Sequence, residues 1–508
     1  MAASSHASKL SDGELDSKTW PQTSGPYETS ARLLPFVTKT VWEEFTPLAK
    51  STGAVNLGQG FPDWAAPDFV KEAMVNAVTI RNDNQYTRSA GHPSLVQKLA
   101  RLYSGWLGRA VDWESEVTVT VGATEALFAL TQSLLGAEDE AVILEPSFDI
   151  YAAQITMAGA ASVRVPLRLV EGAGPGGAAG WKLDPAELEA ALTPKSRLLI
   201  LNTPHNPTGK VFTREELESI ARIVRAHPRL VVLCDEVYEH LTYDGAEHVR
   251  LASLPGMWDR CVTVSSSGKT FSVTGWKVGW VVGPRPLVRS VMTANAWVQF
   301  SVPTPTQSAI AEALAKADSP YQGFPSFYHF LRAQYRGKRD RLVRALRRAG
   351  MRPIVPSAGF FIMAQTAGST VPDKYMAQST PSCPKMTRDW ALARHLTIDH
   401  GVACIPPSAF YCAETKPLAS SLLRFAFCKT DSELAKAAVR LAAIGGAEAV
   451  SEAEAEAAAL VAEGAAGAVA STGAALADAS FGAVHLAAAL GVGVAAGAML
   501  ALSLARRT

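Results

Sequence analysis

Two lysines, Lys269 and Lys277, lie in the short stretch SSSGKTFSVTGWKVGW (265–280), which also has three glycines and follows the apolar run CVTV. An ε-amine is a nucleophile only after it has lost its proton, and a free lysine titrates at about 10.4. Lysine next to glycine can instead bind a phosphate group. The stretch therefore raises two hypotheses, a nucleotide-binding loop and a lysine that holds an aldehyde cofactor.

The nucleotide-binding hypothesis fails on spacing. The letters GKT suggest a P-loop, and VVLCDE (231–236) is similar to the acid-ending strand that holds magnesium in such enzymes. A P-loop requires Gly-x-x-x-x-Gly-Lys-Ser/Thr, but the position of its first glycine is Thr263. The stretch TPHNPTGK (203–210) fails as well, because Pro204 and Val211 occupy two required positions. We therefore disfavour a nucleotide hydrolase.

The second hypothesis gives Lys269 a covalent partner. A Schiff base with pyridoxal phosphate (PLP) loses its proton far more easily than a free ammonium group, and the freed amine can later move a substrate proton. Such a site also needs an acid at the pyridine nitrogen, a phosphate cup, a flat group against the ring and a cation for the substrate carboxylate. The sequence has a candidate for each of these four parts.

Eight stretches with the same kinds of residue are distributed along roughly residues 40–440. They are VNLGQGFPD (55–63), NQYTRSAGHPSL (84–95), VTVGATEALF (119–128), LNTPHNPTGKVF (201–212), DEVYEHLTYDG (235–245), SLPGMWDR (253–260), GKTFSVTGWKVGW (268–280) and RFAFCK (424–429). With these stretches the chain resembles a fold-type I, class I/II aminotransferase. It is most similar to the kynurenine–oxoglutarate transaminase group, also called glutamine transaminase K or cysteine-S-conjugate β-lyase.

The resemblance implies a role for five residues around the cofactor ring. Lys269 bonds to the PLP aldehyde. Asp235 keeps the pyridine nitrogen protonated, because a carboxylate raises the proton affinity of a neighbouring base. Asn206 and Tyr238 hydrogen-bond the ring oxygen O3′, and Phe148 stacks on the ring.

The phosphate cup is expected at the stretch GATEAL. A helix that begins near Thr124 directs free backbone N–H groups at an anion, and the resemblance assigns Ala123 and Thr124 to this role. Ser266 adds a hydroxyl group and Lys277 a counter-charge. Many relatives have an aromatic residue at the position of Thr124, and ATEAL resembles methionine-preferring bacterial relatives instead.

The resemblance also implies a substrate site. Arg424 is expected to bind the substrate α-carboxylate, because a guanidinium group can donate two parallel hydrogen bonds. Gly60 lets the backbone approach the same carboxylate, and Asn206 also touches it. Aromatic pocket walls, some of them from the partner subunit of a homodimer, are Trp42, Tyr86 and Phe300.

These residues predict an enzyme that moves an amino group from an amino acid to a 2-oxo acid. The expected donors are kynurenine, glutamine, methionine and aromatic amino acids. Two other activities stay open, a β-lyase acting on cysteine S-conjugates and a methionine-preferring aminotransferase. A non-catalytic PLP-binding regulator is disfavoured, because every catalytic position is filled.

The elements that would position these residues alternate along the chain. Short apolar runs without polar alternation, such as EAVILEP (140–146) and RLLILNTP (197–204), are separated by helical stretches. This pattern is typical of an α/β fold with a mostly parallel sheet, in which ligands bind beyond the carboxyl ends of the strands. The resemblance implies a PLP-transferase fold of type I, with a seven-stranded sheet in a large domain and a smaller α+β domain.

Changes in composition divide the chain further. We expect residues 1–30 as a disordered lead, 31–60 as a segment joining the small domain, 61–328 as the large PLP-binding domain, 329–445 as the small domain, 446–480 as an Ala-rich linker and 481–505 as a candidate membrane helix. Residues 486–505 carry no charge and precede Arg506 and Arg507, and their length meets the requirement for a membrane helix. A tail anchor and a weakly hydrophobic helix outside the membrane both stay open.

Bulk properties exclude some partners. The net charge is +1 without a basic stripe, which argues against nucleic acid as a partner. The six cysteines are scattered and lack metal-ligand spacing, so we expect no metal and a reducing compartment. The expected location is the cytoplasm, with membrane attachment through the tail or residence in the mitochondrion as alternatives.

Overall fold

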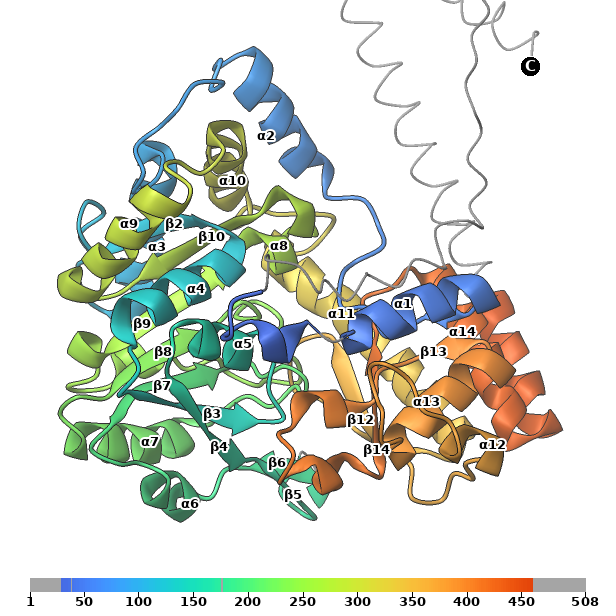
Figure 1. Ribbon diagram of the computed structural model, residues 1–508. Coiled ribbons are helices and arrows are strands. Elements are labelled where there is room, and N and C mark those ends of the chain that lie inside the picture. The colour runs from blue at the N-terminus through green and yellow to red at the C-terminus, as the bar shows by residue number, and fades with distance from the viewer. Residues whose placement is uncertain (1–28, 38, 175–176, 460–508) are drawn as a thin grey trace, which may run out of the picture.

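Seven strands form the central sheet in the computed structural model, which describes residues 29–37, 39–174 and 177–459 (Figure 1). Their spatial order is β2 (Val117–Val121), β10 (Val278–Val282), β9 (Cys261–Ser266), β8 (Val231–Asp235), β7 (Ser196–Asn202), β3 (Glu140–Glu145) and β4 (Ala161–Pro166). All neighbours are parallel except that β10 runs antiparallel to β2 and β9. The expected mostly parallel sheet of seven strands is confirmed.

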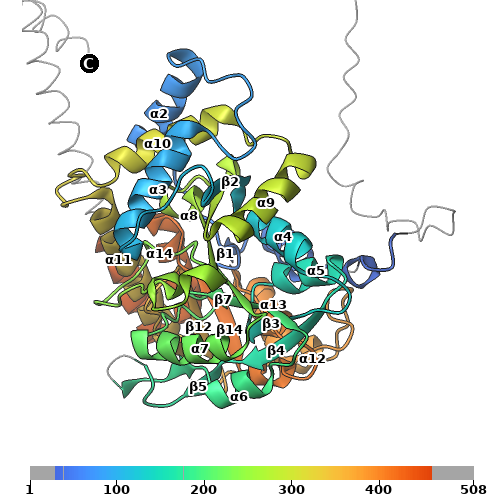
Figure 2. The ribbon, with the colours of Figure 1, turned by 90° about the vertical axis from the view of Figure 1, so that its left-hand side faces the viewer.

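Helices cover both faces of this sheet. One face packs against α4 (Gly122–Leu134), α5 (Ile150–Met157) and α9 (Arg285–Val298), and the other against α7 (Arg214–Ala226). Successive residues of a strand point to opposite faces. In β3, Ala141 and Ile143 therefore pack on the face covered by α4, α5 and α9, and Val142 and Leu144 pack on the face covered by α7. Figure 2 shows α4 and α5 together on one side. Burial on both faces explains why these strands lack polar alternation.

Other elements of this part of the chain lie around the sheet. They are α2 (Asp68–Thr79), α3 (Pro93–Leu107), β5 (Arg168–Val170), β6 (Gly180–Lys182), α6 (Pro185–Ala190), α8 (Ser267–Thr270) and α10 (Thr304–Lys316). Helix α8 is a single turn that follows directly on β9, and it carries Lys269 into the region beyond the strand ends.

A smaller α+β unit follows in the chain, as expected. Its antiparallel sheet consists of β11 (Arg352–Ile354), β12 (Phe361–Gln365) and β14 (Leu422–Ala426), and its helices are α11 (Phe327–Arg348), α12 (Asp373–Met376), α13 (Arg388–Asp399) and α14 (Asp431–Gly445). The N-terminal segment lies against it. Strand β1 (Val55–Asn56) pairs in parallel with β13 (Val402–Ala403), and α1 (Val41–Thr52) contacts α13. The domain boundaries themselves stay a prediction.

The Ala-rich stretch expected as a linker begins with a helix, residues 447–459. Ion pairs hold it to α11, where Arg348 bonds Glu452 at 3.0 Å and Glu456 at 2.7 Å. No helix within the described residues combines the length and apolar character that a membrane crossing requires. The candidate membrane helix (481–505) and nearly all of the lead (1–30) lie outside those residues, so the anchor and the cellular location stay predictions.

Candidate active site

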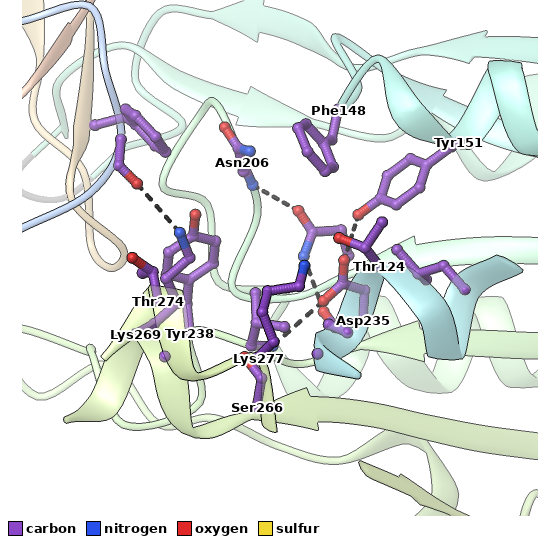
Figure 3. Close-up of a pocket in the computed structure, with 18 of the residues that line it drawn as sticks. Thr124, Phe148, Tyr151, Asn206, Asp235, Tyr238, Ser266, Lys269, Thr274 and Lys277 are labelled. Atoms are coloured by element: carbon purple, nitrogen blue, oxygen red, sulfur yellow. Dashed lines mark hydrogen bonds between the residues drawn. The ribbon is translucent and has the colours of Figure 1, made fainter. Parts of the chain in front are cut away.

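A cavity of about 380 Å³ opens where β7, β8 and β9 end, and its wall is completed by α1 and β14 (Figure 3). All the predicted site residues except two line it: Trp42, Gly60, Ala123, Thr124, Phe148, Asn206, Asp235, Tyr238, Ser266, Lys269, Lys277 and Arg424. The ends of the parallel strands supply Asn206, Asp235 and Lys269 to one edge of the sheet, and side chains from α1 and β14, more than 300 residues apart, complete the same space.

Lys269 extends from α8 to the N-terminal segment. Its Nζ donates to the carbonyl oxygen of Gly60 at 3.1 Å. A Cβ atom at Gly60 would lie 2.4 Å from the ring of Phe361, so only glycine lets this backbone approach so closely. Burial lowers the pKa of Lys269, and no carboxylate within the described residues forms an ion pair with it. The amine is thus biased toward the neutral, nucleophilic form.

Asp235 is the last residue of β8 and is buried. The hydroxyl group of Tyr151 donates to Asp235 Oδ2 at 2.5 Å, and the backbone N–H of Val237 donates to Oδ1 at 3.3 Å. Burial raises the pKa of the Asp235 carboxyl group to about 6, although both hydrogen bonds and the charge of Lys269 act in the opposite direction. A cationic ring nitrogen next to Asp235 would stabilise the ionised carboxylate.

Tyr151 is a site residue that the sequence analysis missed. It lies on the cavity wall, three residues after Phe148 in EPSFDIY, and the two rings meet edge to face at 5.9 Å. The two aromatic residues stand close together in the sequence, so this pair was a usable signal. Its position next to Asp235 was not visible, because the two residues are 84 positions apart.

Asn202 was missed as well. Its side-chain oxygen accepts from the backbone N–H of Asn206 at 2.7 Å, and its amide donates to the backbone oxygens of Asp235 at 2.8 Å and Pro204 at 3.1 Å. Asn202 therefore fixes the loop that presents Asn206 against the end of β8. Tyr238 lines the cavity together with Asn202 and is buried, and this burial raises the pKa of its hydroxyl group.

The end of the cavity near α4 is built for an anion. Helix α4 begins at Gly122, two residues before the expected start near Thr124. A Cβ atom at Gly122 would lie 3.3 Å from Lys277 Nζ, so this ammonium group lies at the helix N-terminus. A Cβ atom at Gly279 would lie 2.4 Å from the Gly122 carbonyl carbon, so glycine in β10 lets the first turn of α4 pack closely. Free N–H groups and a cation suit a phosphate group.

Arg424 is a buried cation without a carboxylate partner among the residues described. Its guanidinium group lies 4.1 Å from the ring of Phe361, 4.8 Å from that of Phe410 and 5.2 Å from that of Trp42. One nitrogen donates to Gly58 O at 2.8 Å, whereas Nε has no partner in the described part of the chain. Burial lowers the pKa of Arg424 to about 10. A bound carboxylate would supply the missing acceptor.

The two remaining predicted residues lie elsewhere. Tyr86 is 83% exposed and Phe300 is 60% exposed, and their rings meet edge to face at 5.3 Å. Neither lines the cavity of its own chain. Their expected contribution to a partner's site stays a prediction.

Comparisons with known proteins agree with this geometry. Residues 52–441 match the family model "Aminotransferase class I and II". The kynurenine–oxoglutarate transaminase of Dictyostelium discoideum is 45% identical over 406 residues, which are 78% of this chain and 92% of that protein. The crystal structure of Bna3p from Saccharomyces cerevisiae is 32% identical with a TM-score of 0.76, covering 83% of this chain and 99% of Bna3p.

A second solved structure is similar over the same part of the chain. YbdL from Escherichia coli, which has a methionine aminotransferase function, is 33% identical with a TM-score of 0.72, and the match covers 82% of this chain and 100% of YbdL. The family model covers most of the chain, and the sequence identity to these proteins is higher than a shared fold alone would give. The chain belongs to the class I and II aminotransferases.

Proposed function

We propose that this aminotransferase binds PLP in the cavity and attaches it through Lys269. The observation that carries the proposal is that an amine, a carboxylate and a guanidinium group, none of them in an ion pair within the described residues, line one cavity. These residues fit the parts of PLP and an amino acid. Lys269 suits the aldehyde, Asp235 the pyridine nitrogen and Arg424 the substrate carboxylate, while Lys277 and the first turn of α4 suit the phosphate group.

The chemistry divides between cofactor and protein. Bound PLP supplies an electron sink that acidifies the Cα–H bond of an amino acid. Asp235 holds the proton on the ring nitrogen and so preserves that sink. Arg424 binds the α-carboxylate in two-point fashion and turns the Cα–H bond away from the ring plane. Lys269 Nζ, once released from the aldehyde by the substrate amine, would serve as the base for the proton on Cα.

The proposed substrates are a large uncharged amino acid of the kynurenine type and a 2-oxo acid acceptor. Aromatic rings from Trp42 and Phe361 line the cavity and suit a flat apolar side chain, while Phe148 suits the cofactor ring. The similarity to a kynurenine–oxoglutarate transaminase supports this choice. Similarity to YbdL, together with Thr124 in place of an aromatic residue, favours methionine as the second candidate. A β-lyase side reaction needs only a donor whose β-carbon carries a leaving group.

We further propose a homodimer with shared active sites. Several large apolar side chains are exposed near one another in sequence, with Trp297 at 89%, Val298 at 55% and Phe300 at 60%. Exposed aromatic residues of this size favour burial against a partner. Tyr86 and Phe300, which pack on each other, would then reach the partner's cavity.

A donor panel tests the substrate choice. Purified protein supplied with PLP, a 2-oxo acid and kynurenine should form kynurenate, because the deaminated product cyclises. Methionine, glutamine and phenylalanine are measured in parallel, and Lys269→Ala serves as the control that removes enzymatic turnover. Normal methionine turnover without kynurenate would assign the enzyme to the methionine-preferring type. Absence of turnover with every donor, although PLP is bound, would contradict the proposal.

A further inference from the structure

Two aromatic residues separate the active-site cavity from a neighbouring one. Trp42 and Phe148 line both spaces, and the second cavity has a volume of about 570 Å³. Asp149 follows Phe148 in the chain and lines this second cavity. A carboxylate therefore lies directly behind the aromatic wall against which a substrate side chain would rest.

A hydrogen bond connects this carboxylate to the wall. Trp42 Nε1 donates to Asp149 Oδ2 at 2.8 Å, and the indole ring of Trp42 lies 5.2 Å from the Arg424 guanidinium carbon. Burial lowers the pKa of Arg424, and the charges of Tyr238 and Asp149 act in the opposite direction. Asp149 thus lies close enough to influence a charged substrate group.

The charge of Asp149 is not neutralised by a described side chain. Asp149 is half-buried and forms no ion pair within residues 29–37, 39–174 and 177–459. The arginine on the same cavity, Arg164, lies 3.4 Å from the carboxylate of Glu145 instead. The second cavity therefore has two carboxylates and one guanidinium group on its wall, and negative charge prevails next to Trp42.

We propose that Asp149 determines specificity by disfavouring dicarboxylic substrates. The inference rests on the proposed function, in which Arg424 binds the α-carboxylate and the side chain extends toward Trp42. A second carboxylate at that end meets the negative charge of Asp149, whereas an uncharged side chain does not. Repulsion across a partly hydrated protein wall, at an effective dielectric constant of about 20, lowers kcat/KM for such a substrate by on the order of tenfold.

Two variants separate charge from position. Asp149→Asn keeps an oxygen that accepts from Trp42 Nε1 but removes the charge. Trp42→Phe removes the hydrogen bond and leaves the charge. With one amino donor held constant, kcat/KM is measured for 2-oxoglutarate, a dicarboxylate, and for 2-oxobutyrate, a monocarboxylate.

We expect Asp149→Asn to raise kcat/KM for 2-oxoglutarate relative to 2-oxobutyrate by about tenfold. Trp42→Phe should lower both values without raising that ratio. Added salt should weaken the discrimination in the wild type and leave the ratio of Asp149→Asn nearly constant, because only a charge is screened.

An unchanged ratio of the two kcat/KM values in an active Asp149→Asn enzyme would overturn the inference. An equal loss with both acceptors, which a purely positioning role for Asp149 predicts, is one form of that result. A wild-type protein that transaminates no donor–acceptor pair would count against the proposed function instead, so the two failures are distinguishable.

Discussion

Two buried groups of charged residues begin at the same strand end and differ in how their charges are paired. Asp235 closes β8 and faces the cavity with Lys269 and Arg424, and none of the three forms an ion pair among the described residues. The next residue, Glu236, faces away and pairs with Arg250, which also bonds Glu239 at 2.6 Å. We call Arg250, Glu236 and Glu239 the closed cluster.

The proton affinities follow this difference. In the cavity, burial raises the pKa of Asp235 to about 6 and lowers that of Arg424 to about 10, so both groups are biased toward the neutral form. In the closed cluster, burial acts in the same way but is outweighed. The pKa of Arg250 lies above its usual value because of the two carboxylates, and that of Glu239 lies below because of Arg250.

The comparison separates structure from function. Buried charges that satisfy one another hold the fold, and removal of one partner is costly. Buried charges without partners are unfavourable in the folded chain. They mark a place where a ligand can supply the opposite charge. Each of the following variants tests one side of this contrast.

Arg250→Met should have the largest effect on stability. It leaves Glu236 and Glu239 as uncompensated buried carboxylates, and breaking such a network costs about 3–5 kcal/mol. Urea unfolding of the purified protein measures the change. A loss below about 1 kcal/mol would show that the closed cluster is not structural.

Arg424→Met should have the opposite profile. The free energy of unfolding should stay the same or rise, because a buried cation without a carboxylate partner in the described chain is replaced by an apolar side chain. The value of kcat/KM should fall by at least about a hundredfold, since two charge-assisted hydrogen bonds of about 1.5–3 kcal/mol each are lost. Equal stability losses in Arg424→Met and Arg250→Met would remove the contrast between the two groups.

Asp235→Asn tests the raised pKa through the pH dependence of stability. In the PLP-free protein the carboxyl titrates at about 6, and in the unfolded chain near 3.8. Its contribution to folding is therefore complete below pH 3.8 and is lost as the pH rises to about 6. The stability of the wild type relative to Asp235→Asn should fall by about 3 kcal/mol between pH 3.8 and 7. A pH-independent difference would contradict the uncompensated burial of Asp235.

Tyr151→Phe should give the smallest effect. It removes the hydrogen bond to Asp235 Oδ2 and leaves the ring in place, so PLP should bind about tenfold more weakly, as the loss of one hydrogen bond to a charged group implies. Tyr103→Phe is the matched control, since its hydroxyl group faces Glu239 in the closed cluster at 3.5 Å. If both variants bind PLP equally well, Tyr151 does not position Asp235.

Sequence reasoning reached the fold through apolar runs. Strands β2, β3, β7, β8 and β9 follow from residues buried on both faces, which leave no polar alternation. Strand β4 was not found because Ser162 and Arg164 alternate with its two valines, and it lies at the edge of the sheet. Strand β10 begins within GWKVGW (275–280), where the lysine and glycines indicated a binding loop, and continues to Val282.

The residues of the site could be predicted one by one, but the sequence did not show which of their charges form ion pairs. Lys269 and Asp235 follow apolar runs that end at the same sheet edge, so their proximity was foreseeable. That Arg424 has no carboxylate partner in the described part of the chain, whereas Arg250 has two, depends on contacts between segments far apart in the chain. Tyr151 and Asn202 were missed for the same reason, since both act on Asp235 from other strands and helices.

The most direct test of the account is the position of the bond to PLP. The protein loaded with PLP is reduced with borohydride, which makes the carbon–nitrogen bond permanent, and its peptides are examined by mass spectrometry. We predict the cofactor on Lys269 alone. Modification of Lys277 in its place, or no modified lysine in a protein that transaminates, would contradict the central claim.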